Sequence, residues 1–179
     1  MERFDPVVLL KVAITPGRRS LRDLEKALGL KKDRLRQSLL RLAEAGLIRK
    51  SSGVRASDVR LGPAIEFFEH AVKYLVPTKI DAESPVLGMP TAWAVSPLRE
   101  VLAVESGSAP WVWPETEGGT VEGWPVRPLI SNVVDLARQD PDLYRALACV
   151  DALRLGQARE RELARHYLIH TIRHAQQVA

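Results

Sequence analysis

The sequence predicts a mainly α-helical protein, in which three helices and a β-hairpin precede an irregular segment and a second helical region. Three observations support this fold class. Apolar residues recur at helical spacing in the first and last thirds of the chain, Asp–Pro and Ser-x-x-Asp pairs mark helix starts, and glycines mark helix ends. The middle third differs, because residues 76–128 hold eight of the twelve prolines and all four tryptophans. We therefore divide the chain into residues 1–75, 76–130 and 131–179.

The first region begins with two predicted helices. In the run DPVVLLKVAI, residues 5–14, Asp5 is expected to cap the helix and Pro6 to occupy its first position, where the missing N–H costs nothing. After a turn, Ser20 and Asp23 have the spacing of a capping box before LRDLEKAL, which stops at a glycine. Local sequence alone therefore places both helix starts.

The third helix is expected to run from Lys32 to Ala45 and to end at Gly46, which enters the left-handed conformation without penalty. On a helical wheel three leucines share one side and predict the buried stripe: Leu35, Leu39 and Leu42. Leu40 does not fit this pattern, because it lies far from the stripe, where a polar residue is expected.

The outer side of this third helix is basic. Arg34, Gln37 and Arg41 are spaced to form an exposed ridge. Further cations flank the ridge at Lys31, Lys32 and Arg36. Residues 18–60 carry 13 Lys or Arg against 5 Asp or Glu, a local charge of +8 in a chain of net charge +4. This asymmetry favours a surface that binds a polyanion.

A hairpin and a fourth helix complete the first region. The run LIRKSSGVRASDVRL alternates apolar and polar residues on both sides of Ser–Ser–Gly, with Lys50 and Arg55 near the tip. Residues 64–75 then have apolar side chains at helical spacing, from Ile65 to Leu75.

The rest of the chain is predicted as a compact irregular segment and a helical region. In WVWPETEGGTVEGWPV the two strand-like runs favour a short hairpin that turns at Gly118–Gly119. Beyond it, Ser131 is expected to cap one helix and Asp140–Pro141 to start another, and residues 157–177 read as a charged amphipathic helix. We expect this last region to dimerise or to bind a partner protein.

Three helices followed by a hairpin, with a basic third helix, is the order of elements in a winged helix-turn-helix. The run SLRDLEKALGLKKDRLRQSLLRLAEAGLIRK resembles the helix-turn-helix of MarR-, GntR- and ArsR-type bacterial transcriptional regulators. It has a Ser-capped scaffold helix, a Gly-containing turn, a recognition helix and the AGLI segment that leads into the wing. The resemblance covers about residues 5–75.

This resemblance implies a sequence-specific regulator of double-stranded DNA, a repressor that acts as a homodimer. The third helix would enter the major groove, where arginine pairs with guanine and glutamine with adenine, each worth about 1–3 kcal/mol of discrimination. The residues expected to read bases are Arg34, Gln37 and Arg41; those expected at phosphates are Ser20, Lys31, Lys32, Arg36, Lys50 and Arg55.

Three alternatives remain open at this level. The basic helix is also consistent with a solvated surface, or with a protein-interaction module whose C-terminal half covers the third helix through Leu40. In addition, GMPTAWAVSPLREVLA and DALRLGQARERELA look similar to uncharacterised bacterial winged-helix proteins, some associated with toxin–antitoxin-like gene pairs. That similarity implies an antitoxin-like autorepressor whose C-terminal half binds a protein partner.

Other function classes find little support. The chain has no GxGxxG, GxxxxGK[ST], GxSxG or HExxH motif, so we expect no enzyme and no cofactor. His166, His170 and His174 recur every four residues, but three successive helical turns are too long for one ion to bind all three, and we expect no metal. A lone Cys149 and the lack of a long apolar run predict a cytoplasmic protein with no membrane segment.

Overall fold

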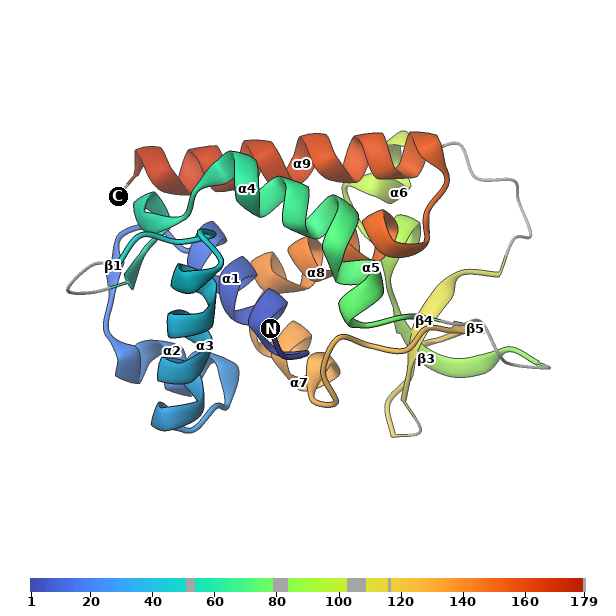
Figure 1. The fold of residues 1–179 in the computed structure, drawn as a ribbon. Helices are drawn as coiled ribbons and strands as arrows, with labels where there is room; N and C mark the ends of the chain where they lie inside the picture. Colours follow the sequence, from blue (N-terminus) through green and yellow to red (C-terminus); the bar gives the residue numbers. More distant parts are fainter. Residues whose placement is uncertain (51–53, 79–83, 103–108, 116, 179) are drawn as a thin grey trace.

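The computed structural model describes residues 1–50, 54–78, 84–102, 109–115 and 117–178. The protein is mainly helical and has two small sheets. Figure 1 shows α2, α3 and β1 at one end of the molecule and the sheet of β3, β4 and β5 at the other. The long helix α9, Ala158–Gln177, runs across both halves.

The three expected N-terminal helices are confirmed as α1 (Asp5–Ile14), α2 (Leu21–Leu28) and α3 (Lys32–Glu44). The capping box at the start of α2 is also confirmed, since the Ser20 hydroxyl accepts from the Asp23 amide and the Asp23 carboxylate accepts from the Ser20 amide. Local signals were therefore sufficient to place these elements.

Two details of these helices differ from the sequence prediction. Phe4, not Asp5, is the N-cap of α1, and Asp5 lies inside the first turn with its side chain buried. In α3 the buried positions are Leu35, Ser38 and Leu42, whereas Leu39 is only half-buried. α1 packs against α3, and Asp5 in the first turn of α1 accepts a hydrogen bond from Arg41 of α3.

The hairpin predicted after α3 is closed at its base, but its returning strand pairs with a segment from outside the hairpin. Ile48 bridges to Val59, and the Arg49 amide donates to the Asp58 carbonyl at 2.8 Å, so the base of the hairpin is closed. The returning strand β2, Val54–Arg55, pairs with β1, Arg18–Arg19, from the segment between α1 and α2. The tip at Ser51 lies outside the described residues.

Residues 61–75 form the expected helix, in three consecutive pieces. They are α4 (Leu61–Glu66), one π-helical turn (Phe67–Ala71) and α5 (Val72–Leu75). This helix packs against α9, whose last turn also reaches the hairpin, because the Gln176 side chain donates to the carbonyls of Ala56 and Val59. The C-terminal helix therefore holds the base of the hairpin.

The predicted hairpin around Gly118–Gly119 is wrong in its pairing, although both strands form. The strands β4 (Trp111–Pro114) and β5 (Val121–Pro125) each pair antiparallel with β3 (Val86–Pro90) and run parallel to each other. Gly88 makes this possible, because a Cβ there would lie 2.4 Å from the Trp113 carbonyl oxygen. Between β3 and β4 lie a 3-10 turn (Ala92–Ala94) and α6 (Leu98–Val101).

The C-terminal region consists of α7 (Val133–Gln139), α8 (Pro141–Leu155) and α9. Asp140 caps α8 as expected, with its carboxylate accepting from the Leu143 amide at 3.0 Å, whereas α7 begins after Asn132 and not after Ser131. α1 and α8 are almost entirely buried and lie side by side, so one hydrophobic core joins the first region to the last.

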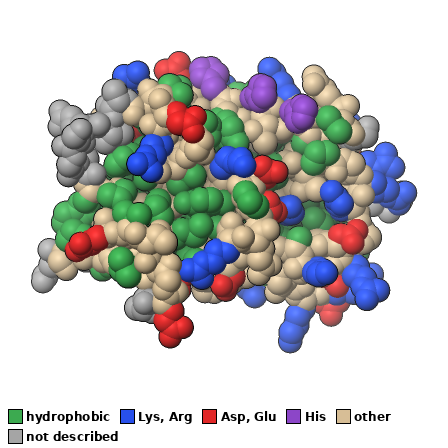
Figure 2. All heavy atoms as spheres, turned by 180° about the vertical axis from the view of Figure 1, so that it is seen from behind, with side chains coloured by type: hydrophobic (Ala, Val, Ile, Leu, Met, Phe, Trp, Pro, Cys, Tyr) green, Lys and Arg blue, Asp and Glu red, His purple; other side chains and the backbone are tan. Residues whose placement is uncertain are grey.

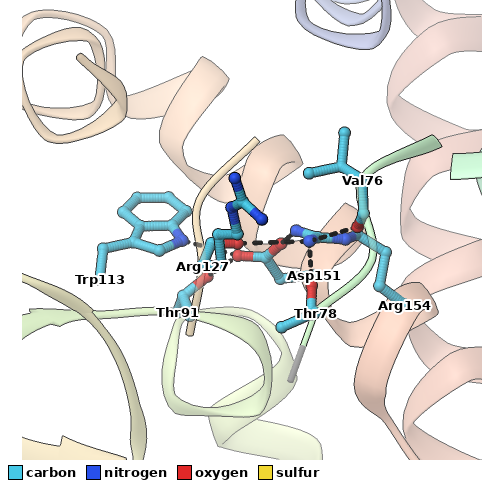
Figure 3. Close-up of polar contacts among 7 residues, drawn as sticks. All are labelled: Val76, Thr78, Thr91, Trp113, Arg127, Asp151 and Arg154. Carbon is cyan, nitrogen blue, oxygen red and sulfur yellow. Dashed lines mark hydrogen bonds and ion pairs between the residues drawn. The ribbon is translucent and has the colours of Figure 1, made fainter. Parts of the chain in front are cut away.

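A buried polar cluster fixes the β-sheet to this core (Figure 3). The Asp151 carboxylate, on α8, accepts hydrogen bonds from Thr91, from the Trp113 indole at 2.7 Å and from Arg154 at 2.5 Å. The side chains of Asp151 and Arg154 are each 1% exposed. Arg154 also donates to the carbonyls of Val76 and Arg127 and to the Thr78 hydroxyl. Four chain segments therefore converge on one ion pair.

Candidate nucleic-acid interface

The outer face of α3 is open to solvent in the folded protein. Of the residues that the sequence singles out on and before this helix, five have exposed side chains: Lys31, Lys32, Arg34, Arg36 and Gln37. Because Leu35, Ser38 and Leu42 are buried, the middle of the exposed face is occupied by Asp33, Leu40 and Glu44, and Arg36 and Gln37 lie on either side of it. This is the surface that α3 offers to a ligand.

Leu40 lies on the same open face, and 47% of it is exposed. The alternative in which the C-terminal half covers α3 through Leu40 is therefore wrong for the described residues. A groove of about 400 Å³ lies beside it, between α3 and the hairpin. Leu39, Ile48 and Val54 line the groove, and Arg36 and Lys50 lie at its edge.

Arg41 is engaged within the protein. Its guanidinium donates two hydrogen bonds, each of 2.9 Å, to the two carboxylate oxygens of Asp5, and it lies 3.1 Å from the Glu2 carboxylate. Asp5 is fully buried. Burial alone would raise the pKa of Asp5, but the hydrogen bonds from Arg41 and from the Glu2 amide outweigh it, and the pKa lies below its ordinary value of 3.8.

Arg34 lies on the same side of α3 as Arg41. Its guanidinium carbon is 4.2 Å from the centre of the Phe4 ring, a cation–π contact with the residue that precedes α1. The expected ridge of Arg34, Gln37 and Arg41 is therefore not the centre of the open face. Two of its three members turn toward the N-terminus, and only Gln37 faces outward without a contact of this kind.

A second hollow, of about 780 Å³, continues the basic surface around the start of α2. Lys32 and Arg36 contribute to it from α3, together with three arginines that the sequence analysis did not select: Arg18, Arg19 and Arg22. All three side chains are exposed. The Arg18–Arg19 pair directly before the Ser20 cap is a sequence signal that points to this surface. Ser20 lines the hollow, but its hydroxyl and amide already bond to Asp23.

The two hairpin residues lie next to these cations. Arg55 is exposed on β2, directly opposite Arg18 on β1. Lys50 is exposed at the end of the described part of the hairpin. Figure 2 shows Lys and Arg side chains gathered at the end of the molecule that carries α2 and α3, with apolar side chains prominent on the other half. The basic residues thus occupy one end of the fold.

Other kinds of site find no counterpart in the described residues. No three His, Cys, Asp or Glu side chains converge there as a metal site would require. No helix in the described ranges combines the length and the apolar character needed to cross a membrane. Comparison of the chain with protein-family models, curated proteins and solved structures found no match.

Proposed function

We propose that the protein is a sequence-specific double-stranded DNA-binding regulator, a repressor, in which α1, α2, α3 and the hairpin act as a winged helix. The observation that carries the proposal is the open face of α3, whose exposed Lys32 and Arg36 continue into the arginine-lined hollow beside α2. Five cations line that hollow against two acids, Asp23 and Glu25. An excess of positive charge in a concave surface attracts a polyanion from solution, and an α-helix fits the major groove.

The geometry favours a revised division of roles on this surface. Arg36 and Gln37, on either side of the middle of the open face, are the exposed hydrogen-bonding side chains that we assign to base edges in the groove. Arg41 is assigned to holding Asp5, because using it on DNA would leave a buried carboxylate unpaired. Ser20 is assigned to capping α2, because its hydroxyl and amide already bond to Asp23. Phosphates are assigned to the surrounding exposed cations: Lys31, Lys32, Arg34, Lys50, Arg55, Arg19 and Arg22.

We also propose that the DNA-bound form is a homodimer. Winged-helix proteins read two half-sites through two-fold symmetry, so each protomer presents one recognition helix. The apolar surface on the half of the molecule away from α2 and α3 (Figure 2) would leave both basic ends free in such a dimer.

The double variant Lys32→Ala/Arg36→Ala tests the proposal. It removes two exposed cations that form no ion pair within the described residues, so the fold should be retained. We expect the affinity for a duplex selected from a random pool to fall by at least about tenfold, since each lost charged contact costs on the order of 1 kcal/mol. Fluorescence anisotropy at fixed salt measures this change.

The matched control removes the same charge from the other end of the molecule. Arg159→Ala/Arg161→Ala acts on exposed residues in the first turn of α9. We expect this control to bind the duplex within about twofold of the wild type, because surface charges further away than a Debye length, about 8 Å, are screened. Equal losses in the two double variants would mean that net charge, and not the α3 face, governs binding.

The groove beside Leu40 favours a second candidate, a protein-interaction module. Its apolar lining and the cations at its edge, Arg36, Arg49 and Lys50, suit an acidic amphipathic segment of a partner protein. This function depends on Leu40 and not on Gln37. If Leu40→Asp abolishes binding of a partner protein and Gln37→Ala does not affect it, the result favours the protein-interaction module over DNA reading. Such a result would also support an antitoxin-like role.

A further inference from the structure

A pocket of about 450 Å³ lies on the other side of α3, between the N-terminal segment, the start of α3 and residues 127–132. It is separate from the groove beside Leu40 and from the hollow beside α2, and it shares Arg34 with the exposed side chains of α3. Its volume falls in the usual range of small-molecule sites, roughly 300–1,000 Å³. The pocket joins the first region of the chain to the segment that leads into α7.

Three arginines from three separate segments line this pocket: Arg3, Arg34 and Arg127. All three side chains are exposed, and in the described part of the chain none of them lies within ion-pair distance of a carboxylate. No Asp or Glu in the described ranges lines the pocket. Guanidinium groups gathered in one hollow repel one another when it is empty, and an anion with several oxygens neutralises them.

The same pocket offers apolar and neutral polar surface beside the cations. Phe4 and Leu129 are buried beneath it, and the Phe4 ring supports the Arg34 guanidinium at 4.2 Å. Ser131 and Asn132 add a hydroxyl and an amide at the rim. A few polar groups over an apolar floor are the usual composition of a ligand site, in which the floor takes a carbon skeleton.

The buried polar cluster holds one of these arginines in position. The Arg127 carbonyl accepts a hydrogen bond of 3.3 Å from Arg154, which is itself paired with Asp151. Figure 3 shows the Arg127 guanidinium directed away from this ion pair. The backbone of Arg127 is thus fixed while its side chain stays available, an arrangement that reduces the ordering cost of binding a ligand.

From these observations we propose that the pocket binds a small organic anion with at least two negative charges, carried by phosphate or carboxylate groups on a short carbon skeleton. Arginine provides two parallel donors for either group, which is why it is suited to both. The pocket shares Arg34 with the surface assigned to DNA, whereas Arg3 and Arg127 lie outside that surface and therefore test the pocket separately.

Isothermal titration calorimetry on the full chain, with inorganic pyrophosphate and citrate as probes at physiological salt, tests this site. We expect saturable binding of at least one probe to the wild type without DNA. Arg3→Gln and Arg127→Gln should each weaken it by at least about tenfold, the usual effect of losing a charge-assisted hydrogen bond. The control Arg159→Gln, an exposed arginine on α9, should stay within about twofold.

Three results would overturn the proposal. The first is that neither pyrophosphate nor citrate binds saturably. The second is that Arg159→Gln weakens probe binding as much as Arg127→Gln does, which indicates attraction to net charge alone. The third is that neither probe binds and that Arg3→Gln and Arg127→Gln weaken duplex binding as much as Lys32→Ala/Arg36→Ala does. The last result would identify the three guanidiniums as contacts to DNA phosphates. Probe binding by a protein without affinity for DNA would support this site and contradict only the DNA-binding proposal.

Discussion

Replacing Asp151 by alanine is expected to lower the free energy of unfolding by about 3–5 kcal/mol, the cost of leaving one member of a buried ion pair alone. The substitution strands the Arg154 guanidinium, whose side chain is 1% exposed, and removes the acceptor of the Thr91 and Trp113 hydrogen bonds. Burial raises the pKa of Asp151, while Arg154, Thr91 and Trp113 favour its ionised form. Chemical denaturation followed by circular dichroism measures the change.

Asp142 supplies the matched control for this prediction. It lies on the same helix, α8, and its side chain is 78% exposed with a surface ion pair of 3.5 Å to Arg145. Such pairs contribute about 0–1 kcal/mol, so Asp142→Ala should change stability little. If Asp151→Ala is as stable as Asp142→Ala, the cluster does not anchor the β-sheet to the core.

The second large effect is expected at the junction of α1 and α3. Arg41→Ala should lower the free energy of unfolding by about 1.5–3 kcal/mol, because it removes two charge-assisted hydrogen bonds from Asp5, which is fully buried. Arg36→Ala, on the same helix, is the control, since Arg36 is exposed and should cost less than about 0.5 kcal/mol. Equal costs would show that the Asp5 contact contributes nothing specific.

This pair also predicts a dependence on pH. The pKa of Asp5 in the folded protein lies below its ordinary value of 3.8, so folding favours the ionised carboxylate. The stabilisation is present above pH 3.8 and is lost as the pH falls through the folded-state pKa. The difference in stability between wild type and Arg41→Ala should therefore be full near neutral pH and shrink below pH 3.8; a difference that persists unchanged in acid would contradict the assignment.

Local sequence signals were sufficient for most of the helical elements. The Ser20 and Asp140 caps and the left-handed glycines Gly29 and Gly46 depend on interactions within a few residues, and the structure places them where the sequence does. Apolar spacing likewise predicted helices at residues 64–75 and 157–177, and the structure has helices over both ranges. These features can be predicted from the sequence because they depend on interactions between residues close together in the chain.

The features that sequence reasoning missed depend on contacts between distant segments. Asp5, the residue with which Arg41 pairs, is 36 residues away in the sequence. A helical wheel of α3 alone therefore counts Arg41 among the exposed side chains. The two strand-like runs of β4 and β5 were predicted, but their pairing with β3 depends on the close approach at Gly88, in a segment that is distant in sequence from both. The exposure of Leu40 has the same origin, because only the packed fold shows what covers α3.

The most direct test of the α3 surface is the change in amide chemical shifts of the ¹⁵N-labelled protein when a selected duplex is added. We expect the largest changes between Lys32 and Gln37, further changes at Arg18–Ser20 and Arg55, and little change in α9. Largest changes on α7 or α9, or no changes at a duplex excess, would contradict DNA binding through this face.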